Sequence, residues 1–379
     1  MSIFRHTLFL VFFLSVVGRL EITFRVCLPK TEGRQMSKSE AEAATKAFDN
    51  AVSIQIGCRD VMEQSLFDAS PDLLKLLLKD YSYFPKKDNK YSNIRWLTSS
   101  YETRGVGFKA NNIIAIKSIT GANKDVIRPR IVKSQEEQKK RSSYSAEVFT
   151  PIWVCNLQNN LIDKAWFGTE ESPFNREADK SYIENPQPIK FPNGKTWQDY
   201  VLLQRLEITC GEAPYLVSRY DVVTGEMIPI GKRVGLLDRK LRVICENVAE
   251  KEQWLEWAIK ALESTYGFDI QGDNVLLARE NILYSVLEWY AYKFPTSTPN
   301  IVDDISLSTL KCFAQIISWN IWQMDGIKYT VPEKTQQIEV QTGELFDPVR
   351  MEEAPIYSQI KDWSTGEKLY FKDLVIQEK

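Results

Sequence analysis

The stretch "RLEITCGEAPYLVSRYD", which runs from Arg205 to Asp221, decides the fold of this chain. An apolar run at 206–209 predicts a short strand, and Cys210 and Gly211 predict a tight turn in which the backbone can approach a ligand closely. The amphipathic residues after Pro214 predict the start of a helix. A strand, a glycine turn and a helix form either a nucleotide-type binding loop or a structural corner of the fold.

Strands and helices alternate after this stretch. Strands separated by helices predict a parallel sheet, and therefore an α/β domain. The tail, 330–379, predicts a polar loop with two short strands. The expected elements are a helix over 250–264, a strand over 266–270, a helix over 273–292, a helix over 306–318 and a strand over 320–324.

The residues before this stretch have a different pattern. The segment "SPDLLKLLLKDY", Ser70 to Tyr81, predicts a helix with a serine N-cap and a proline in its first turn. Residues 81–123 predict short strands, a helix is expected to begin at Pro151, and 168–198 predict a loop. We divide the chain into a signal-like segment at 1–35, a small α+β region of helices and strands with a basic connector at 36–140, and the α/β domain at 141–379.

Composition excludes several classes of site. The chain has 379 residues and is 44% hydrophobic, which is enough for a substantial core. Its only histidine is His6, so the folded body has no Ser-His-Asp triad, no Cys-His pair and no His-based zinc site. The six cysteines form no CxxC pair, which argues against a metal site and favours a reducing compartment.

The first residues resemble a targeting signal. "MSIFRHTLFLVFFLSVVG" has a basic start and an apolar run that is too short for a comfortable membrane span. Met36 opens "MSKSEAEAATKAFDNAV", which is typical of the start of a cytoplasmic protein. We expect a cytoplasmic protein that begins at Met36 and does not enter a membrane; a secretory signal is the alternative.

Acidic residues and glycines follow successive strands. In a parallel sheet, ligands bind beyond the carboxyl ends of the strands, so Gly211, Asp269 and Asp325 are expected at one edge. A carboxylate at Asp269 can accept hydrogen bonds from both hydroxyls of a ribose, and Asp325 can accept from an adenine amino group. Asp238 is a second candidate for the ribose by its spacing from Gly211. There is no GxGxxG dinucleotide motif.

Two segments are rich in basic residues. The net charge of -2 means that any contact with nucleic acid must come from such local patches. The connector from Lys124 to Arg141 is either a solvated linker or an arm that contacts phosphates, and the insert from Lys232 to Arg242 is either an exposed helix face or a second phosphate contact. The candidate residues are Arg128, Arg130, Lys139, Lys140, Arg141, Arg239, Lys240 and Arg242.

Four motifs carry a resemblance to a known family. They are "SAEVFTPIWVCNLQNNLIDKAWFG", "RLEITCGEAPYLVSRYD", "LLDRKLRVICEN" and "IISWNIWQMDG". They resemble bacterial and phage proteins called restriction endonuclease subunit M, over roughly residues 50–379. The order of an FTP element, a Gly motif, an acidic strand and an Asp is similar to that of the gamma-ordered N6-adenine DNA methyltransferases.

This resemblance implies a Rossmann-like, S-adenosylmethionine-dependent methyltransferase sheet with helices on both faces. It also implies an adenine N6-methyltransferase-like subunit of a restriction-modification system that binds S-adenosyl-L-methionine and double-stranded DNA. A restriction nuclease, a helicase or a specificity subunit would be its partner. The residues that the resemblance places around the cofactor are Phe149, Thr150, Pro151, Glu207, Cys210, Gly211, Asp269 and Asp325.

The sequence departs from the family pattern at two places. Glu212, Ala213 and Pro214 stand where the family usually has Ser-Gly and one further residue. The family's Asn-Pro-Pro-Tyr tetrapeptide does not occur, and neither "NPQP" at 185–188 nor "FDPV" at 346–349 supplies its aromatic residue. No catalytic residue is therefore assigned. The alternative is a non-catalytic cofactor- or DNA-binding subunit that a partner chain completes.

Overall fold

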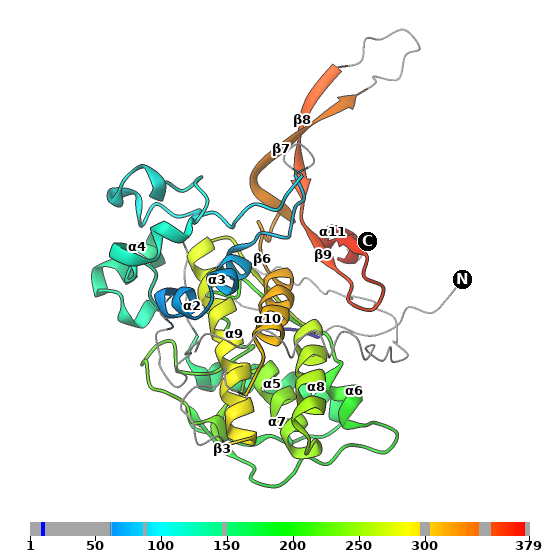
Figure 1. Cartoon of the computed structure of the whole chain (residues 1–379). Coiled ribbons are helices and arrows are strands. Elements are labelled where there is room, and N and C mark those ends of the chain that lie inside the picture. Colours follow the sequence, from blue (N-terminus) through cyan, green and yellow to red (C-terminus); the bar gives the residue numbers. More distant parts are fainter. Residues whose placement is uncertain are drawn as a thin grey trace.

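The protein is a mixed α/β structure built on a small parallel sheet (Figure 1). The strands of this sheet are β4 (Arg205–Ile208), β5 (Thr265–Asp269) and β6 (Ile321–Gln323), and β1 (Phe9–Val11) pairs with the other edge of β4. The sheet order is β1-β4-β5-β6, and all the pairs are parallel. The computed structural model describes residues 9–11, 61, 63–85, 89–145, 150–295, 304–340 and 350–375.

The helices that connect the strands lie close to the predicted positions. Between β4 and β5 are α7 (Leu236–Asn247) and α8 (Lys251–Glu263), and between β5 and β6 are α9 (Gly272–Lys293) and α10 (Leu307–Asn320). Helix α9 is buried on every side over most of its length, so it forms the centre of the helical layer in Figure 1. These bounds confirm the parallel α/β pattern that the alternation of strands and helices predicts.

The two faces of the sheet are covered differently. Leu206, Tyr266, Phe268 and Trp322 point to one face, as expected for alternate residues of neighbouring strands, and pack with residues of the C-terminal segment such as Phe371. This segment contains β9 (Gln359–Lys361), β10 (Lys368–Tyr370) and the one-turn helix α11 (Phe371–Leu374). On this face the main cover is therefore a small hairpin and a single helical turn, whereas we expected helices on both faces.

The helix predicted directly after Pro214 is wrong. The chain makes turns there, and the next helical element is the short 3-10 helix η7 (Ile230–Lys232). The carbonyls of Tyr215 and Leu216 accept hydrogen bonds from the first residues of α7. Because tertiary partners satisfy this backbone, no i to i−4 helical ladder is needed.

The N-terminal region is made of short helices. α3 (Pro71–Leu78) agrees with the helix predicted for 70–81 and packs on α10, and α2 (Glu63–Ala69) comes directly before it. The strands predicted for 81–123 are wrong, because the chain forms isolated bridges and 3-10 turns there. These turns are η2 (Glu102–Arg104), η3 (Val106–Phe108), η4 (Ile116–Ser118) and η5 (Gly121–Asn123).

The connector and the segment after it are more ordered than predicted. The basic connector contains η6 (Arg130–Val132) and α4 (Gln135–Ser145), and α5 (Ile152–Phe167) follows Pro151 as expected. The predicted loop contains a hairpin of β2 (Asn175–Ala178) and β3 (Ser181–Glu184), followed by α6 (Trp197–Val201). Most of the signal-like segment, Met36 and 37–60 lie outside the described residues.

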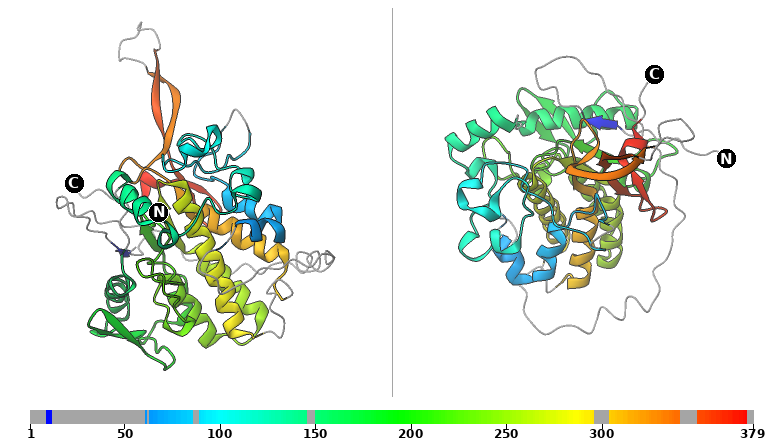
Figure 2. Two further views of the ribbon diagram at one scale, coloured as in Figure 1. Left: turned by 90° about the vertical axis from the view of Figure 1, so that its left-hand side faces the viewer. Right: turned by 90° about the horizontal axis from the view of Figure 1, so that it is seen from above.

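A long two-stranded hairpin was not predicted. β7 (Thr330–Val340) and β8 (Arg350–Tyr357) pair in antiparallel fashion and project from the body as an arm (Figures 1 and 2). The predicted polar loop thus contains the longest strands that the structure describes. The two strands predicted for the tail correspond in part to the end of β8 with β9, and to β10 with α11.

Candidate functional site

The turn after β4 has an unusual backbone. Thr209, Gly211 and Ala213 all have positive φ angles, of 48°, 52° and 63°, and they alternate with residues of negative φ. The turn is closed by its own backbone, since the N–H of Ala213 donates to the carbonyl of Cys210 at 2.7 Å. Ala213 thus adopts the left-handed conformation that glycine takes most readily.

Asp269, the last residue of β5, binds this turn. Its Oδ2 accepts a hydrogen bond from the N–H of Gly211 at 3.0 Å, and its Oδ1 accepts from the N–H of Gln271 at 2.8 Å. The N–H of Cys210 donates to the carbonyl of Phe268 at 2.8 Å. As predicted, the glycine turn after β4 lies beside the acidic residue that ends β5. The carboxylate of Asp269 supports the turn.

Glu207 lies beneath the same turn. It is buried, and its two oxygens accept the N–H groups of Tyr215 at 3.4 Å and Leu216 at 3.2 Å. Burial raises the pKa of Glu207 well above its ordinary value, and the two backbone donors oppose that rise. Its side chain holds the segment after the turn.

Glu212, the residue after Gly211, is also a structural contact. It is buried, and it accepts hydrogen bonds from the N–H of Arg130 at 2.5 Å and from the hydroxyl of Tyr220 at 2.8 Å. The backbone carbonyl of Glu212 accepts from Asn281 of α9 at 3.0 Å. Glu212 therefore ties the turn to the connector and to the central helix.

The FTP element is attached to the same turn. The carbonyl of Pro151 accepts the N–H of Val154, the third residue of α5, at 2.9 Å. Further along α5, Asn159 donates to the carbonyl of Tyr215 at 3.0 Å. Thr150 and Pro151 therefore belong to an element that is bonded to the glycine turn, and Phe149 lies outside the described residues.

Asp325 reaches the same edge but is used differently. The N–H of Met324 donates to the backbone carbonyl of Asp269 at 3.1 Å, so the ends of β5 and β6 are adjacent. However, the Oδ1 of Asp325 accepts the N–H groups of Ile327 and Lys328, both at 3.0 Å. Its carboxylate therefore closes its own turn.

The N-terminal region crosses this edge of the sheet. Gln323 of β6 accepts from the N–H of Arg95 at 2.9 Å and donates to its carbonyl at 2.8 Å, and the N–H of Gly272 donates to the carbonyl of Trp96 at 3.0 Å. A Cβ at position 272 would lie 1.9 Å from the carbonyl oxygen of Arg95. Sequence reasoning missed these residues, because no local pattern marks Arg95 or Gln323 as partners.

A buried charge cluster lies at the start of α9. The Oδ2 of Asp273 lies 2.8 Å from Nη1 of Arg141 and 3.6 Å from Nζ of Lys133, and it accepts from the hydroxyl of Tyr101 at 2.8 Å. Burial raises the pKa of Asp273, but Arg141 first and then Lys133 outweigh it and lower the pKa to about 2. Arg141 is thus an internal partner and not a surface contact.

The basic insert is also turned inward, which corrects the second phosphate-contact prediction. Arg239 binds Asp163 through Nη1 at 2.6 Å, and Lys240 donates to the carbonyl of Leu203 at 2.6 Å. Both side chains are buried, and Arg242 is bound to Glu246 at 2.8 Å. These three side chains of α7 make their contacts inside the protein, because α7 packs against α6, α8 and α9.

The remaining predicted site residues differ in their exposure to solvent. Asp238 accepts hydrogen bonds from Ser218 and from the indole of Trp289, so it serves the interior and is not placed at the strand ends. Lys139 and Lys140 are exposed on α4. Arg128 and Arg130, which come before α4, are half-buried.

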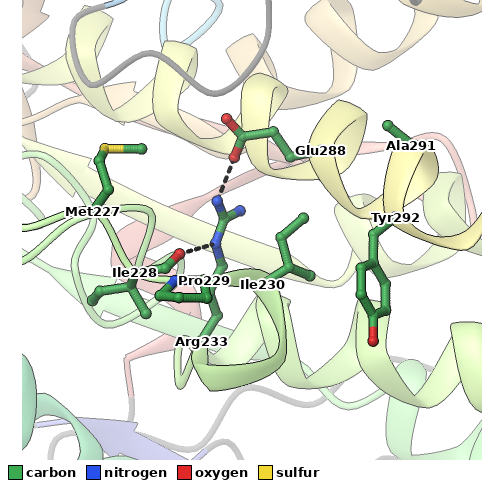
Figure 3. A pocket seen from close by; sticks show the side chains of 8 residues that line it. All are labelled: Met227, Ile228, Pro229, Ile230, Arg233, Glu288, Ala291 and Tyr292. Carbon is green, nitrogen blue, oxygen red and sulfur yellow. Dashed lines mark hydrogen bonds and ion pairs between the residues drawn. The ribbon is translucent and has the colours of Figure 1, made fainter. Parts of the chain in front are cut away.

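An apolar cavity of about 460 Å³ lies elsewhere (Figure 3). Arg233 stands in its wall and binds Glu288 at 2.6 Å and the carbonyl of Ile228 at 3.3 Å. None of the predicted site residues lines this cavity. Its lining residues are Met227, Ile228, Pro229, Ile230, Arg233, Glu288, Ala291 and Tyr292.

Within the described part of the chain, no three His, Cys, Asp or Glu residues come together as a possible metal site. Among the helices described, none has both the length and the apolar character needed to cross a membrane. Comparison of the chain with protein-family models, with curated proteins and with solved structures found no match.

Proposed function

We propose that this chain binds S-adenosyl-L-methionine at the carboxyl ends of β4 and β5, as an adenine N6-methyltransferase-like subunit of a restriction-modification system. The observation that supports the proposal is the hydrogen bond between Asp269 Oδ2 and the N–H of Gly211. It joins the glycine turn after one parallel strand to the acid at the end of the next strand. This is the place where open α/β sheets bind ligands.

The chemistry of these residues fits such a cofactor. Oδ2 of Asp269 accepts the N–H of Gly211 and Oδ1 accepts the N–H of Gln271. A carboxylate is an acceptor that can bind both hydroxyls of a ribose. The left-handed residues Gly211 and Ala213 keep the turn tight, so the backbone can approach the amino-acid part of the cofactor. The cofactor supplies the methyl group when it is bound.

The other cofactor residues of the proposal have unequal support. Thr150 and Pro151 belong to a helix start that is bonded to the segment after the glycine turn, which favours a role beside the cofactor. Glu207 acts by holding the backbone of that segment. The Oδ1 of Asp325 holds the N–H groups of Ile327 and Lys328, so Oδ2 is the oxygen that would accept from an adenine amino group. Nζ of Lys328 lies 3.7 Å from this oxygen.

The DNA part of the proposal rests on fewer residues than the sequence predicted. Lys139 and Lys140 are exposed on α4, and we propose them as contacts to the phosphates of double-stranded DNA. The family's Asn-Pro-Pro-Tyr tetrapeptide is missing from the chain. Its absence favours the second candidate function, a cofactor-binding subunit that gains its catalytic residues from a partner chain.

Binding of the cofactor is the first test. Titration calorimetry with S-adenosyl-L-methionine should give measurable affinity, and Asp269→Asn should weaken it by about tenfold to a hundredfold, the effect of losing hydrogen bonds to a charged group. Asp362→Asn is the matched control, because Asp362 also accepts from its own turn and lies away from the glycine turn. The proposal fails if the unmodified protein does not bind the cofactor, or if both variants behave alike.

Transfer of a labelled methyl group to DNA separates the two candidate functions. Transfer by the purified chain alone supports a complete enzyme. Cofactor binding without transfer, with transfer restored by a partner subunit, supports the incomplete one. A restriction nuclease, a helicase and a specificity subunit are the partners to test.

A further inference from the structure

The apolar cavity in Figure 3 has the size of a small-molecule site. Its volume of about 460 Å³ falls in the range of about 300–1,000 Å³ that ligand pockets occupy. The loop at 227–230 forms one wall, and the last turns of α9, with Ala291 and Tyr292, form the other. The charged residues of the lining are Arg233 and Glu288, so an apolar body in the cavity would meet few polar groups.

The cavity is distant from the proposed cofactor site. Helix α9 begins at Gly272, next to the ends of the strands, and reaches the cavity at Glu288. The two residues are 16 positions apart (288 − 272), which corresponds to about 24 Å along the helix. The described lining of the cavity includes none of the residues at the ends of β4 and β5. A ligand here would therefore not occupy the place of the cofactor.

One nitrogen of the Arg233 guanidinium is left without a partner. Nε donates to the carbonyl of Ile228 at 3.3 Å, and Nη2 donates to Glu288 at 2.6 Å. Nη1 is buried and has no hydrogen-bond partner in the described part of the chain. Figure 3 shows this third nitrogen, which has no dashed line, on the side of Ile230 and within the ring of lining side chains. Because buried donors are normally paired, Nη1 calls for an acceptor from outside the chain.

The guanidinium is held in place before any ligand arrives. The side chain of Arg233 is only 3% exposed, and its two bonds fix the plane of the group. Arg219 holds Glu288 in turn, through Nη2 at 2.8 Å and Nε at 3.1 Å. An incoming acceptor would thus meet a donor that is already oriented, which lowers the entropy lost on binding.

Charge favours an anion at this donor. The carboxylate of Glu288 is shared by two guanidinium groups, those of Arg219 and Arg233. Burial raises the pKa of Glu288, but Arg219 first and then Arg233 outweigh it and keep the pKa below its ordinary value. Asp238, a second carboxylate that the charge of Arg233 reaches, is bonded to Ser218, and burial raises its pKa. The direct contact of two guanidinium groups with one carboxylate therefore has one positive charge in excess.

We propose that this cavity binds a small carboxylic acid with an apolar body. The carboxylate accepts a hydrogen bond from Nη1 of Arg233, which matches it in both charge and donor type. The apolar body lies between the loop at 227–230 and Ala291, and the exposed ring of Tyr292 packs against its outer end. This site is independent of the proposed cofactor site.

Binding of octanoate to the full chain tests the proposal. Calorimetry at neutral pH should give a dissociation constant on the order of 100 µM, which suits a ligand of this size. 1-Octanol has the same chain but no charge, and it should bind at least about tenfold more weakly because hydrogen bonds to a charged acceptor are the stronger ones. The proposal is overturned if octanoate does not bind, or if 1-octanol binds equally well.

Two variants and a control locate the site. Ala291→Phe fills the cavity and removes no charge, so it should abolish octanoate binding and leave the urea midpoint unchanged. Arg233→Lys keeps a charge for Glu288 but removes the spare donor, and affinity should fall about tenfold to a hundredfold. Arg242→Lys is the matched control, since Arg242 is bound to Glu246 and does not line the cavity.

The filled cavity decides the outcome even where Arg233→Lys does not fold. Octanoate binding to Ala291→Phe with the affinity of the unmodified chain contradicts the proposal. So does a loss of affinity in Arg242→Lys as large as that in a folded Arg233→Lys.

Discussion

Two segments of similar basic composition have different environments in this protein. The connector at 124–141 places Lys139 and Lys140 in solvent on α4, whereas α7 buries Arg239 and Lys240. The difference lies in the partners that the fold supplies. Helix α7 packs against α8, α9 and α6. Asp163 of α5 faces the guanidinium of Arg239. A count of charges therefore does not distinguish a nucleic-acid surface from an internal ion pair.

The largest effect is expected at Arg239. Arg239→Met removes a buried partner of Asp163 and the donors to Asn156 and Asn160. The free energy of unfolding should therefore fall by about 3–5 kcal/mol. Urea unfolding followed by circular dichroism measures this change. Lys139→Met on the exposed face of α4 is the control and should leave the midpoint unchanged. If Arg239→Met changes the urea midpoint as little as Lys139→Met does, the two basic segments do not differ in their contribution to stability.

Acid should destabilise the protein through Asp273, the buried carboxylate that binds Arg141 of the connector. The pKa of Asp273, the partner of Arg141, is lowered from 3.8 to about 2, so the folded state binds its proton less readily than the unfolded state. The resulting stability, roughly 2 kcal/mol, is fully present above pH 4 and is lost as the pH falls toward 2. Asp273→Asn should lack this loss. If both proteins lose stability in parallel between pH 4 and pH 2, Asp273 is not held by Arg141.

Lys240 should show a smaller effect, at the alkaline end of the pH range. Burial first, and Arg205 second, lower its pKa well below 10.5. The folded state then binds fewer protons than the unfolded state, so the free energy of unfolding rises as the pH approaches 10.5. Lys240→Met should abolish that rise and cost about 1–3 kcal/mol at neutral pH, because the Leu203 and Ser264 carbonyls lose their donor.

The exposed pair should change binding with little effect on folding. In the double variant Lys139→Gln, Lys140→Gln, we expect weaker binding to double-stranded DNA and a salt dependence that is less steep by about two units, one for each phosphate contact. Filter binding at several salt concentrations measures this slope. The same substitution at Arg242, which is bound to Glu246 and to backbone carbonyls, should leave the slope unchanged. An unchanged slope in the double variant excludes α4 from the DNA contact.

The part of the fold that sequence could predict is the part with strong local patterns. β5, α9, α10 and β6 lie within two residues of the predicted ranges, because each is a continuous apolar or amphipathic run with clear ends. The meeting of Asp269 with Gly211 follows from the geometry of parallel strands. That part of the candidate site was therefore predictable.

The rest depends on contacts between distant residues. Tyr215 and Leu216 donate their N–H groups to Glu207 and accept from α7, so an amphipathic pattern there does not become a helix. Asp325 and Asp269 look alike as acids at strand ends, yet one closes its own turn and the other supports a neighbouring turn. Which of two partners a carboxylate binds is decided in space, and the sequence does not record it.

The crossing of Arg95 over Gln323 has a consequence for synthesis on the ribosome. The two residues are 228 positions apart, so at 5–20 residues per second the first waits about 10–45 s for its partner to be made. During that interval Leu73 and Leu77 of α3, which end up fully buried, lack the α10 surface on which they pack. The first of the described helices to emerge thus gain their α10 neighbour late, and a nascent chain must keep them from aggregating until then.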